Sequence, residues 1–464
     1  MKIKKIVMLA SMLLLASCTN IKLSSDSSIS DNLKESTTIS DISSTSSLKS
    51  SDDVSSSINS NKLSLNKFTY SSLNEINNDE GLTPSTGDVN ILLIPLHFSD
   101  SRQKMDTNLI NIAFNSKQDE LVEWYSVHEF YQISSYNKLN LNFVMSEVYT
   151  PSHSASYYTN NYNNYNYVYA SDSILKEALT YLQNKMDLTQ FDSNNDGYID
   201  GVYFIYDYPV DFSYQNELWW AYTYYYQEED LFSSLKAKSY VFAGYDFFTS
   251  DGLNCDTHTY IHEMAHMFGI DDYYDYDTSK GTNRGGLAGG DLMDSTIGDH
   301  NAYSKALLQW NEGVYVSGEG SVEVELENFE KSGNFIILAN SFNKDLGLFQ
   351  EYFILEYYTP TYLHEFDQIF NVCGIRVLHI VATKKKDGTL RYNNTDTNYK
   401  LISQITNENG STYISNTAKR SDDTLFVENE SLKNVKLSDE STLKYGFKVN
   451  SLNDDKAFLT IYSK

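Results

Sequence analysis

Residues 262–272, which read HEMAHMFGIDD, constrain this chain more than any other stretch. Residues four apart on a helix lie on the same face, so His262 and His266 can offer two imidazole nitrogens to one zinc ion. Gly269 can adopt a left-handed conformation that ends the helix and turns Asp272 back toward the ion. The stretch therefore predicts a helix, a sharp turn and a zinc site with His262, His266 and Asp272 as ligands.

The chemistry of this ligand set favours catalysis. Two imidazoles and a carboxylate leave one position open for water, as in catalytic zinc sites. Zinc brings the pKa of bound water toward neutrality, and Glu263 could accept the proton as that water attacks a peptide carbonyl. We therefore expect peptide-bond hydrolysis with Glu263 as general base and acid. The third ligand has two alternatives, because Asp271 is adjacent and a remote glutamate could serve instead.

The residues around the motif also support a helix. Asp256 or Thr257 could cap its start. The other positions form an apolar stripe that can be buried away from the histidines: Ile261, Met264, Ala265 and Phe268. A charged helix that matches the motif by chance is the alternative, but Gly269 and Asp272 at their fixed offsets make it much rarer.

The N-terminus predicts export and membrane attachment. Residues 1–17 combine early lysines with a short apolar run, as in a secretory signal peptide. The run ends in Leu-Ala-Ser-Cys18, which looks like a bacterial lipobox and implies cleavage before Cys18 and lipid attachment to its sulfur. Residues 18–62 are rich in serine and predict a disordered tether, and residues 63–86 predict a pro-segment or linker. We expect an extracytoplasmic protein, lipid-anchored at the bacterial cell surface and released if the tether is cut.

The charge of the chain limits its partners. A formal net charge of −27 and a pI near 4.6 argue against binding to the phosphate backbone of nucleic acids. The same acidity suits an extracellular protein that gathers divalent cations. Proteins or peptides as substrates, and the membrane through the anchor, are the expected partners.

A second stretch carries a family resemblance. Residues 126–139 read SVHEFYQISSYNKL and, with the zinc stretch, resemble the immune-inhibitor-A family of secreted bacterial metalloproteases. Phe130 at the first aromatic position and Asn137 in place of the usual glycine depart from the family pattern. The resemblance covers about residues 87–383 and implies a secreted zinc endopeptidase.

The expected fold class is α+β. Gly-x-x-ligand is the metzincin spacing and favours Asp272 as the third ligand. Residues 87–316 are expected to form a metzincin-like zinc protease domain, whose N-terminal sheet roofs the cleft and whose zinc helix forms its floor. An apolar run at residues 89–98 predicts its first strand. From residue 317 to 464, short alternating runs predict an all-β, sandwich-like C-terminal domain.

Further residues follow from this comparison. Met293 would match the methionine turn beneath the metal of metzincins, although a plain core methionine is the alternative. His300 or Tyr303 could stabilise an oxyanion, as could Tyr273 or Tyr274, but each could simply pack.

A second metal site is suggested by an acidic loop. The predicted Ca²⁺ ligands are Asp192, Asn194, Asp196, Tyr198 and Asp200. Tyr203 stands where an EF-hand needs a bidentate glutamate, which excludes a true EF-hand. Calcium binding and a metal-free polar turn both stay open.

Two further questions stay open from the sequence. Cys255 and Cys373 could form a disulfide or remain buried thiols. A surface adhesin or glycan-binding lipoprotein, with binding by tyrosine-rich loops and a structural metal, is the alternative function. The intact Glu263 argues against it.

Overall fold

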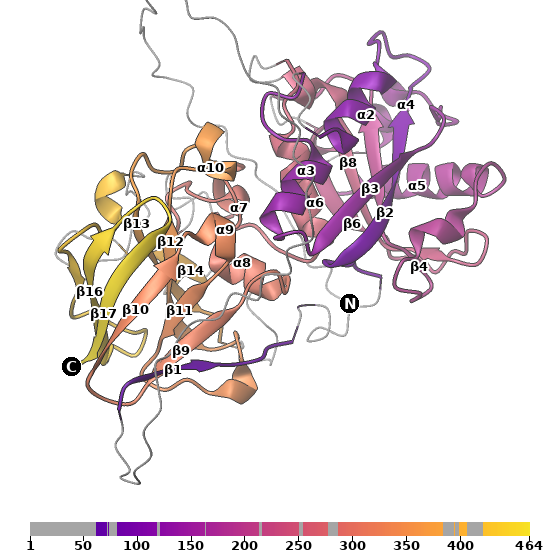
Figure 1. The fold of residues 1–464 in the computed structure, drawn as a ribbon. Helices are drawn as coiled ribbons and strands as arrows, with labels where there is room; N and C mark the ends of the chain where they lie inside the picture. The colour runs from indigo at the N-terminus through magenta and orange to yellow at the C-terminus, as the bar shows by residue number, and fades with distance from the viewer. Residues whose placement is uncertain are drawn as a thin grey trace, which may run out of the picture. The chain divides into compact units, whose positions relative to one another are not determined.

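The computed structural model describes residues 62–71, 73, 81–117, 121–162, 164–212, 216–249, 254–276, 286–383, 394, 399–405 and 421–464 (Figure 1). The predicted signal peptide, the lipid-attachment residue Cys18 and nearly all of the predicted tether lie outside these residues. Residues Lys62–Lys464 form one compact unit. The fold of this unit mixes α-helices and β-sheets, as expected at the level of fold class.

A five-stranded sheet forms the centre of the N-terminal half, with strand order β3-β2-β5-β8-β6. Its strands are β2 (Gly87–Leu96), β3 (Leu139–Met145), β5 (Val202–Tyr206), β6 (Tyr222–Tyr225) and β8 (Ser239–Gly244). The other four strands pair in parallel, whereas β6 pairs antiparallel to β8 at the edge. The apolar run predicted as the first strand is β2, and its burial on both faces explains its composition.

Helices cover this sheet: α2 (Thr107–Asn115), α3 (Val127–Ser134), α4 (Ala155–Asn161), α5 (Val168–Leu182) and α6 (His258–Met267). Side chains alternate between the two faces of a strand. Tyr240 of β8 meets Ser171 of α5 on one face, and Thr223 of β6 meets Glu263 of α6 on the other. None of the helices in the described part of the chain is long and apolar enough to cross a bilayer.

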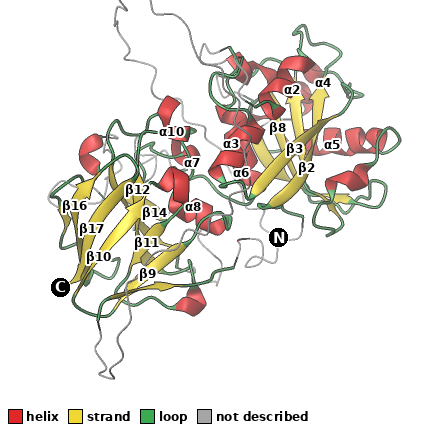
Figure 2. Cartoon of the chain, in the orientation of Figure 1, coloured by secondary structure: helices red, strands yellow, loops and turns green. Residues whose placement is uncertain are grey.

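Two short helices, α7 (Leu292–Ser295) and α8 (Ala302–Leu307), lead into the C-terminal half, where strands dominate (Figure 2). One sheet has the order β1-β9-β11-β12-β13-β14 and the other the order β10-β17-β16-β15. The first contains β1 (Ser64–Lys67), β9 (Gly313–Ser317), β11 (Phe335–Leu338), β12 (Glu351–Tyr358), β13 (Gly374–Val381) and β14 (Ile402–Gln404). The second contains β10 (Ser321–Glu327), β15 (Ser431–Leu432), β16 (Tyr445–Leu452) and β17 (Lys456–Ser463).

Two large hydrophobic cores organise these layers: the first core belongs mainly to the N-terminal half, and the second core is shared by the two C-terminal sheets. Side chains of the two C-terminal sheets share one core, which includes Phe353, Val377 and Leu459. The opposite face of the larger sheet joins the core of the N-terminal half through Tyr352, Ile354 and other residues. Strands β12 and β13 are therefore buried on both faces, whereas β10 alternates between buried and exposed positions.

The segment predicted as a pro-segment or linker contributes to this fold. Its strand β1 pairs antiparallel with β9, and Ser64 to Lys67 face Ser317 to Val314 in register. The polar sequence SLNK gives no strong local signal for a strand, so this pairing depends on the distant partner.

Candidate metal centre

Helix α6 begins close to where the sequence predicts. The carboxylate of Asp256 accepts a hydrogen bond from the backbone N–H of His258 at 3.0 Å. Thr257 occupies the N-cap position, but its side chain makes no capping hydrogen bond, because its hydroxyl donates to the carbonyl of Tyr125. The predicted apolar stripe is fully buried in the first core, as expected.

Hydroxyl groups from neighbouring elements fix the helix in place. Four of them donate to backbone carbonyls of α6: Tyr203 to Tyr260 (2.9 Å), Tyr131 to Ile261 (2.6 Å), Thr223 to Glu263 (2.8 Å) and Tyr225 to His266 (2.7 Å). The donors belong to β5, α3 and β6. The position of α6 is therefore set by three separate elements around it.

The turn after α6, residues 269–272 and called the metal turn below, brings the three predicted ligands together. Gly269 has φ +89°, the left-handed conformation that the sequence predicts. The Asp272 Oδ1 atom lies 3.1 Å from His262 Nε2 and 3.4 Å from His266 Nε2. The two Nε2 atoms are 3.2 Å apart. This group is the one set of three acidic, histidine or cysteine side chains that converges within the described ranges.

Hydrogen bonds fix which imidazole nitrogens face the centre of the group. Nδ1 of His262 lies 2.9 Å from the Leu292 carbonyl, and Nδ1 of His266 lies 2.7 Å from the Ile270 carbonyl. A carbonyl can only accept, so each Nδ1 carries a proton and the Nε2 atom of each neutral ring carries a lone pair.

Three electron-rich atoms therefore point at one another in a buried place. Asp272 is 1% exposed, and its Oδ1 receives no hydrogen bond from any described residue. The two Nε2 atoms and the carboxylate oxygen repel one another unless a cation lies between them. The donor set, two imidazoles and one carboxylate, suits Zn²⁺.

The close approach of His262, His266 and Asp272 shifts the pKa values of His266 and Asp272. Burial opposes the shift, but the Asp272 carboxylate raises the pKa of His266 to about 10. Burial also opposes ionisation of Asp272, but His266 and His262 hold its pKa well below the usual range. A proton can thus take the place of the metal, and metal binding would release it.

Glu263 lies beside the ligands and is 2% exposed. Burial raises the pKa of its carboxyl, against the effect of the two histidines. Its Oε2 atom lies 3.0 Å from Thr223 Oγ1 and shares the one hydroxyl proton with the carbonyl of Glu263, which orients the carboxylate. Thr223 could not be predicted from the sequence, because nothing local marks a residue on a distant edge strand as a partner of Glu263.

Tyr276 is a second residue that the sequence analysis missed. Its hydroxyl lies 2.7 Å from Asp272 Oδ2 and 2.8 Å from Asp271 Oδ1. Asp271, the alternative third ligand, also accepts a hydrogen bond from the backbone N–H of Asp272 at 2.9 Å. The converging group contains Asp272, and neither Asp271 nor a glutamate belongs to it among the described residues.

Met293 lies in α7 and is fully buried. Its carbonyl accepts a hydrogen bond from Tyr273 N at 2.8 Å, and the preceding residue, Leu292, binds His262 through its carbonyl. The segment thus contacts the ligand-bearing helix. Its role as a methionine turn stays a prediction.

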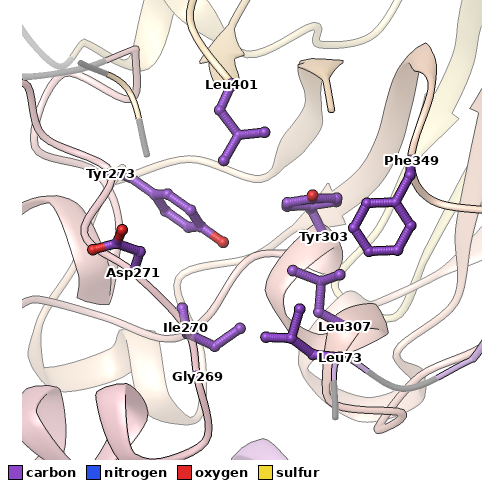
Figure 3. A pocket seen from close by; sticks show the side chains of 9 residues that line it. All are labelled: Leu73, Gly269, Ile270, Asp271, Tyr273, Tyr303, Leu307, Phe349 and Leu401. Carbon is purple, nitrogen blue, oxygen red and sulfur yellow. The ribbon is translucent and has the colours of Figure 1, made fainter. Parts of the chain in front are cut away.

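The candidate oxyanion residues lie in packed surroundings. His300 is enclosed by the rings of Phe130, Tyr131 and Trp310, and burial lowers its pKa to about 3. Tyr303 and Tyr273 line a cavity of about 10 Å³ behind the metal turn (Figure 3). The hydroxyl of Tyr273 lies 2.7 Å from Ser304 Oγ. These positions suit packing, and an oxyanion role stays a prediction.

The acidic loop folds on its own backbone. Its carboxylates accept hydrogen bonds from loop N–H groups: Asp192 from Asp196 and Gly197, Asp196 from Tyr198, and Asp200 from Ser193. The amide of Asn194 donates to Asp196 at 3.0 Å. Burial raises the pKa of Asp200 to about 6, and Asp196 and Asp192 add to this shift. A polar turn explains these contacts, and Ca²⁺ stays a prediction.

Cys255 and Cys373 are both thiols, and no disulfide joins them in the part of the chain that the structure describes. Cys255 is buried in the first core, and Cys373 packs half-buried against the second. Of the two alternatives that the sequence left open, the structure has the thiols.

The structure thus gathers His262, His266, Asp272 and Glu263 into one buried site between α6, the metal turn and β6. This geometry is the ground for assigning a function, because no family model and no curated protein matches the chain.

Proposed function

We propose that the protein is a zinc-dependent endopeptidase with a metzincin-like catalytic domain. The observation that carries the proposal is the convergence of two imidazole Nε2 atoms and one carboxylate oxygen beside a buried glutamate. The antiparallel edge strand next to α6, and the resemblance of residues 126–139 and 262–272 to immune-inhibitor-A proteases, support it.

Each residue of the site would have a separate role in hydrolysis. His262, His266 and Asp272 would hold Zn²⁺, a Lewis acid that polarises a peptide carbonyl and makes water more acidic. Glu263 would accept the proton of the attacking water and deliver it to the departing amine. Thr223 would keep the Oε2 atom of Glu263 engaged, so that Oε1 exchanges the proton.

Strand β6 suggests how a substrate would be held. It is the last strand of its sheet, so one of its edges lies outside the ladder, and its residue Thr223 contacts Glu263. An extended peptide can add to such an edge through backbone hydrogen bonds. We therefore propose extended segments of extracellular proteins or peptides as substrates, cleaved at the bacterial surface by an enzyme anchored through Cys18.

The substitution Glu263→Gln tests the mechanism. It keeps the size of the side chain but removes the proton acceptor, so hydrolysis should fall by about a hundred- to ten-thousand-fold while bound zinc stays near one ion per chain. Zinc content and cleavage of a mixed peptide library would be measured together. Glu323→Gln, at an exposed position on β10, is the matched control and should behave as the parent protein.

Two outcomes would count against the proposal. Cleavage by Glu263→Gln at the parental rate would remove the proposed role of Glu263. Stoichiometric zinc in a parent protein that cuts no peptide of the library would instead favour the adhesin or glycan-binding lipoprotein with a structural metal.

A further inference from the structure

The described residues 62–71 and 73, called the N-terminal strap here, run from the C-terminal sheet to the metal turn. At its start, Leu63 N donates to Glu319 O at 2.7 Å, and β1 pairs along β9. Leu63 is 2% exposed and packs in the core that the two C-terminal sheets share. The strap therefore begins as an integral strand of the fold.

Aromatic residues continue this attachment. The ring of Phe68 lies 4.9 Å from that of Phe342, and the hydroxyl of Tyr70 donates to the carbonyl of Asn311. Both side chains pack against the first core. The strap thus passes from one core to the other.

Leu73 ends the strap directly behind the metal turn. It is 2% exposed, and its Cδ2 atom would lie 3.2 Å from a Cβ placed on Gly269. Figure 3 shows Leu73 beside Ile270 and Leu307 in the cavity that Gly269 and Asp271 also line. Leu73 therefore covers the side of Gly269 on which a side chain would otherwise stand.

The metal turn, in front of Leu73, positions two of the three proposed ligands. Asp272 directly follows the turn residues that line the cavity, and the carbonyl of Ile270 accepts the Nδ1 proton of His266. A shift of the metal turn would therefore move the Asp272 carboxylate and loosen the hydrogen bond that orients His266.

The residues just before β2 complete the same support. The side chain of Leu82 would lie 3.4 Å from a Cβ on Gly269. The backbone N–H of Thr83 donates to the carbonyl of Met267 at 3.2 Å, which satisfies one of the last carbonyls of α6. Removal of residues 63–86 would uncover Gly269 and leave the carbonyl of Met267 without this donor.

We propose that Leu73 is a positioning residue for the metal turn, and that the strap stays in the active protein, so that maturation cleavage falls before Lys62. This inference rests on the proposed zinc site, because its effect is exerted through Asp272 and His266. It assigns to the expected pro-segment or linker a permanent role in metal binding.

Zinc affinity, measured by competition with a chromophoric chelator, tests the role of Leu73. Leu73→Ala should weaken binding about tenfold, the lower end of the effect of residues that orient ligands. Leu63→Ala removes an equally buried leucine of the same strap from the other core, so it should leave zinc affinity unchanged. Leu73→Met refills the space and should restore most of the affinity.

Equal affinities of the Leu73→Ala and Leu63→Ala proteins would overturn the proposal. Should Leu73→Ala fail to fold, Leu73→Val carries the same comparison. A parent protein that binds no zinc would instead refute the proposed function, so the two failures can be told apart.

The N-terminus of the mature protein is the second test. Intact mass of the active protein, isolated from its native membrane or medium, should place the first residue at or before Lys62. An active protein that begins after Lys62 would overturn retention of the strap, whatever its affinity for zinc.

Discussion

The hydroxyl of Tyr276 contacts one oxygen of Asp272 and leaves the other to face the imidazoles. Removing it in Tyr276→Phe should lower zinc affinity about tenfold, because the carboxylate then loses the group that orients it. Activity at saturating zinc should fall less. Tyr226→Phe, which removes a hydroxyl bound to Asp230 near the surface, is the matched control. Unchanged zinc affinity in Tyr276→Phe would contradict the role given to this hydroxyl.

At the scale of single residues, the sequence predicts the groups that belong to a spaced pattern. Two histidines four apart and a carboxylate after a glycine are recognisable in one dimension, and the structure brings them together. Thr223 could not be predicted, because nothing in the local sequence links it to Glu263. Tyr276 could not be predicted either, because this chain has 38 tyrosines and no spacing rule separates one of them from the rest. The choice between Asp271 and Asp272 likewise needed the geometry of the turn.

Helix α6 carries an ionisable residue at its first position. His258 lies 2.7 Å from Asp256 and 3.6 Å from Asp367, and its ring stacks on Trp124. Burial opposes protonation, but Asp256 and Asp367 raise the pKa of His258 from 6.5 to about 9. The raised pKa means that the charged form stabilises the folded state.

The stability of the folded protein should therefore fall as the pH becomes alkaline, because His258 loses its proton. A histidine with a raised folded-state pKa contributes fully below its unfolded value, near 6.5, and loses this contribution as pH rises through about 9. The free energy of unfolding should fall by up to a few kcal/mol across this window. In urea titrations at several pH values, His258→Gln should remove the share of this dependence that comes from His258, while His266, whose pKa is also raised, contributes a second share in metal-free protein. An equal slope in both proteins would exclude His258 as its source.

At the scale of elements, periodicity and glycine predict α6 and its end, and an apolar run predicts β2. Strand β1 could not be predicted, because its four mostly polar residues form a strand only against β9. The edge position of β6 is equally a property of strand order, which no local stretch encodes.

Arg376 of β13 ties the C-terminal sheet to the loop before Met293. Its fully buried guanidinium lies 3.2 Å from Glu356, and it donates to the carbonyl of Gly290 at 2.6 Å. Arg376→Ala leaves the buried carboxylate of Glu356 without this partner and should cost about 3–5 kcal/mol of unfolding free energy. Lys331→Ala breaks the exposed pair with Asp455 and should change stability little. Similar midpoints in denaturant for both variants would contradict this difference.

At the scale of the whole molecule, the sequence predicts a mixed helical and β fold but not the sharing of cores. The predicted boundary at residues 316 and 317 falls at the end of β9, which pairs with both β1 and β11. Tyr352 and Ile354 lie in the same core as the five-stranded sheet, although the sequence separates them widely. Such contacts depend on which faces meet in three dimensions.

The shared core has a consequence for how the molecule melts. Side chains of the larger C-terminal sheet belong to the same contiguous core as the five-stranded sheet, so we expect the two halves to lose their packing together. Calorimetry should record one heat-absorption peak, and either half produced alone should aggregate through its uncovered apolar face.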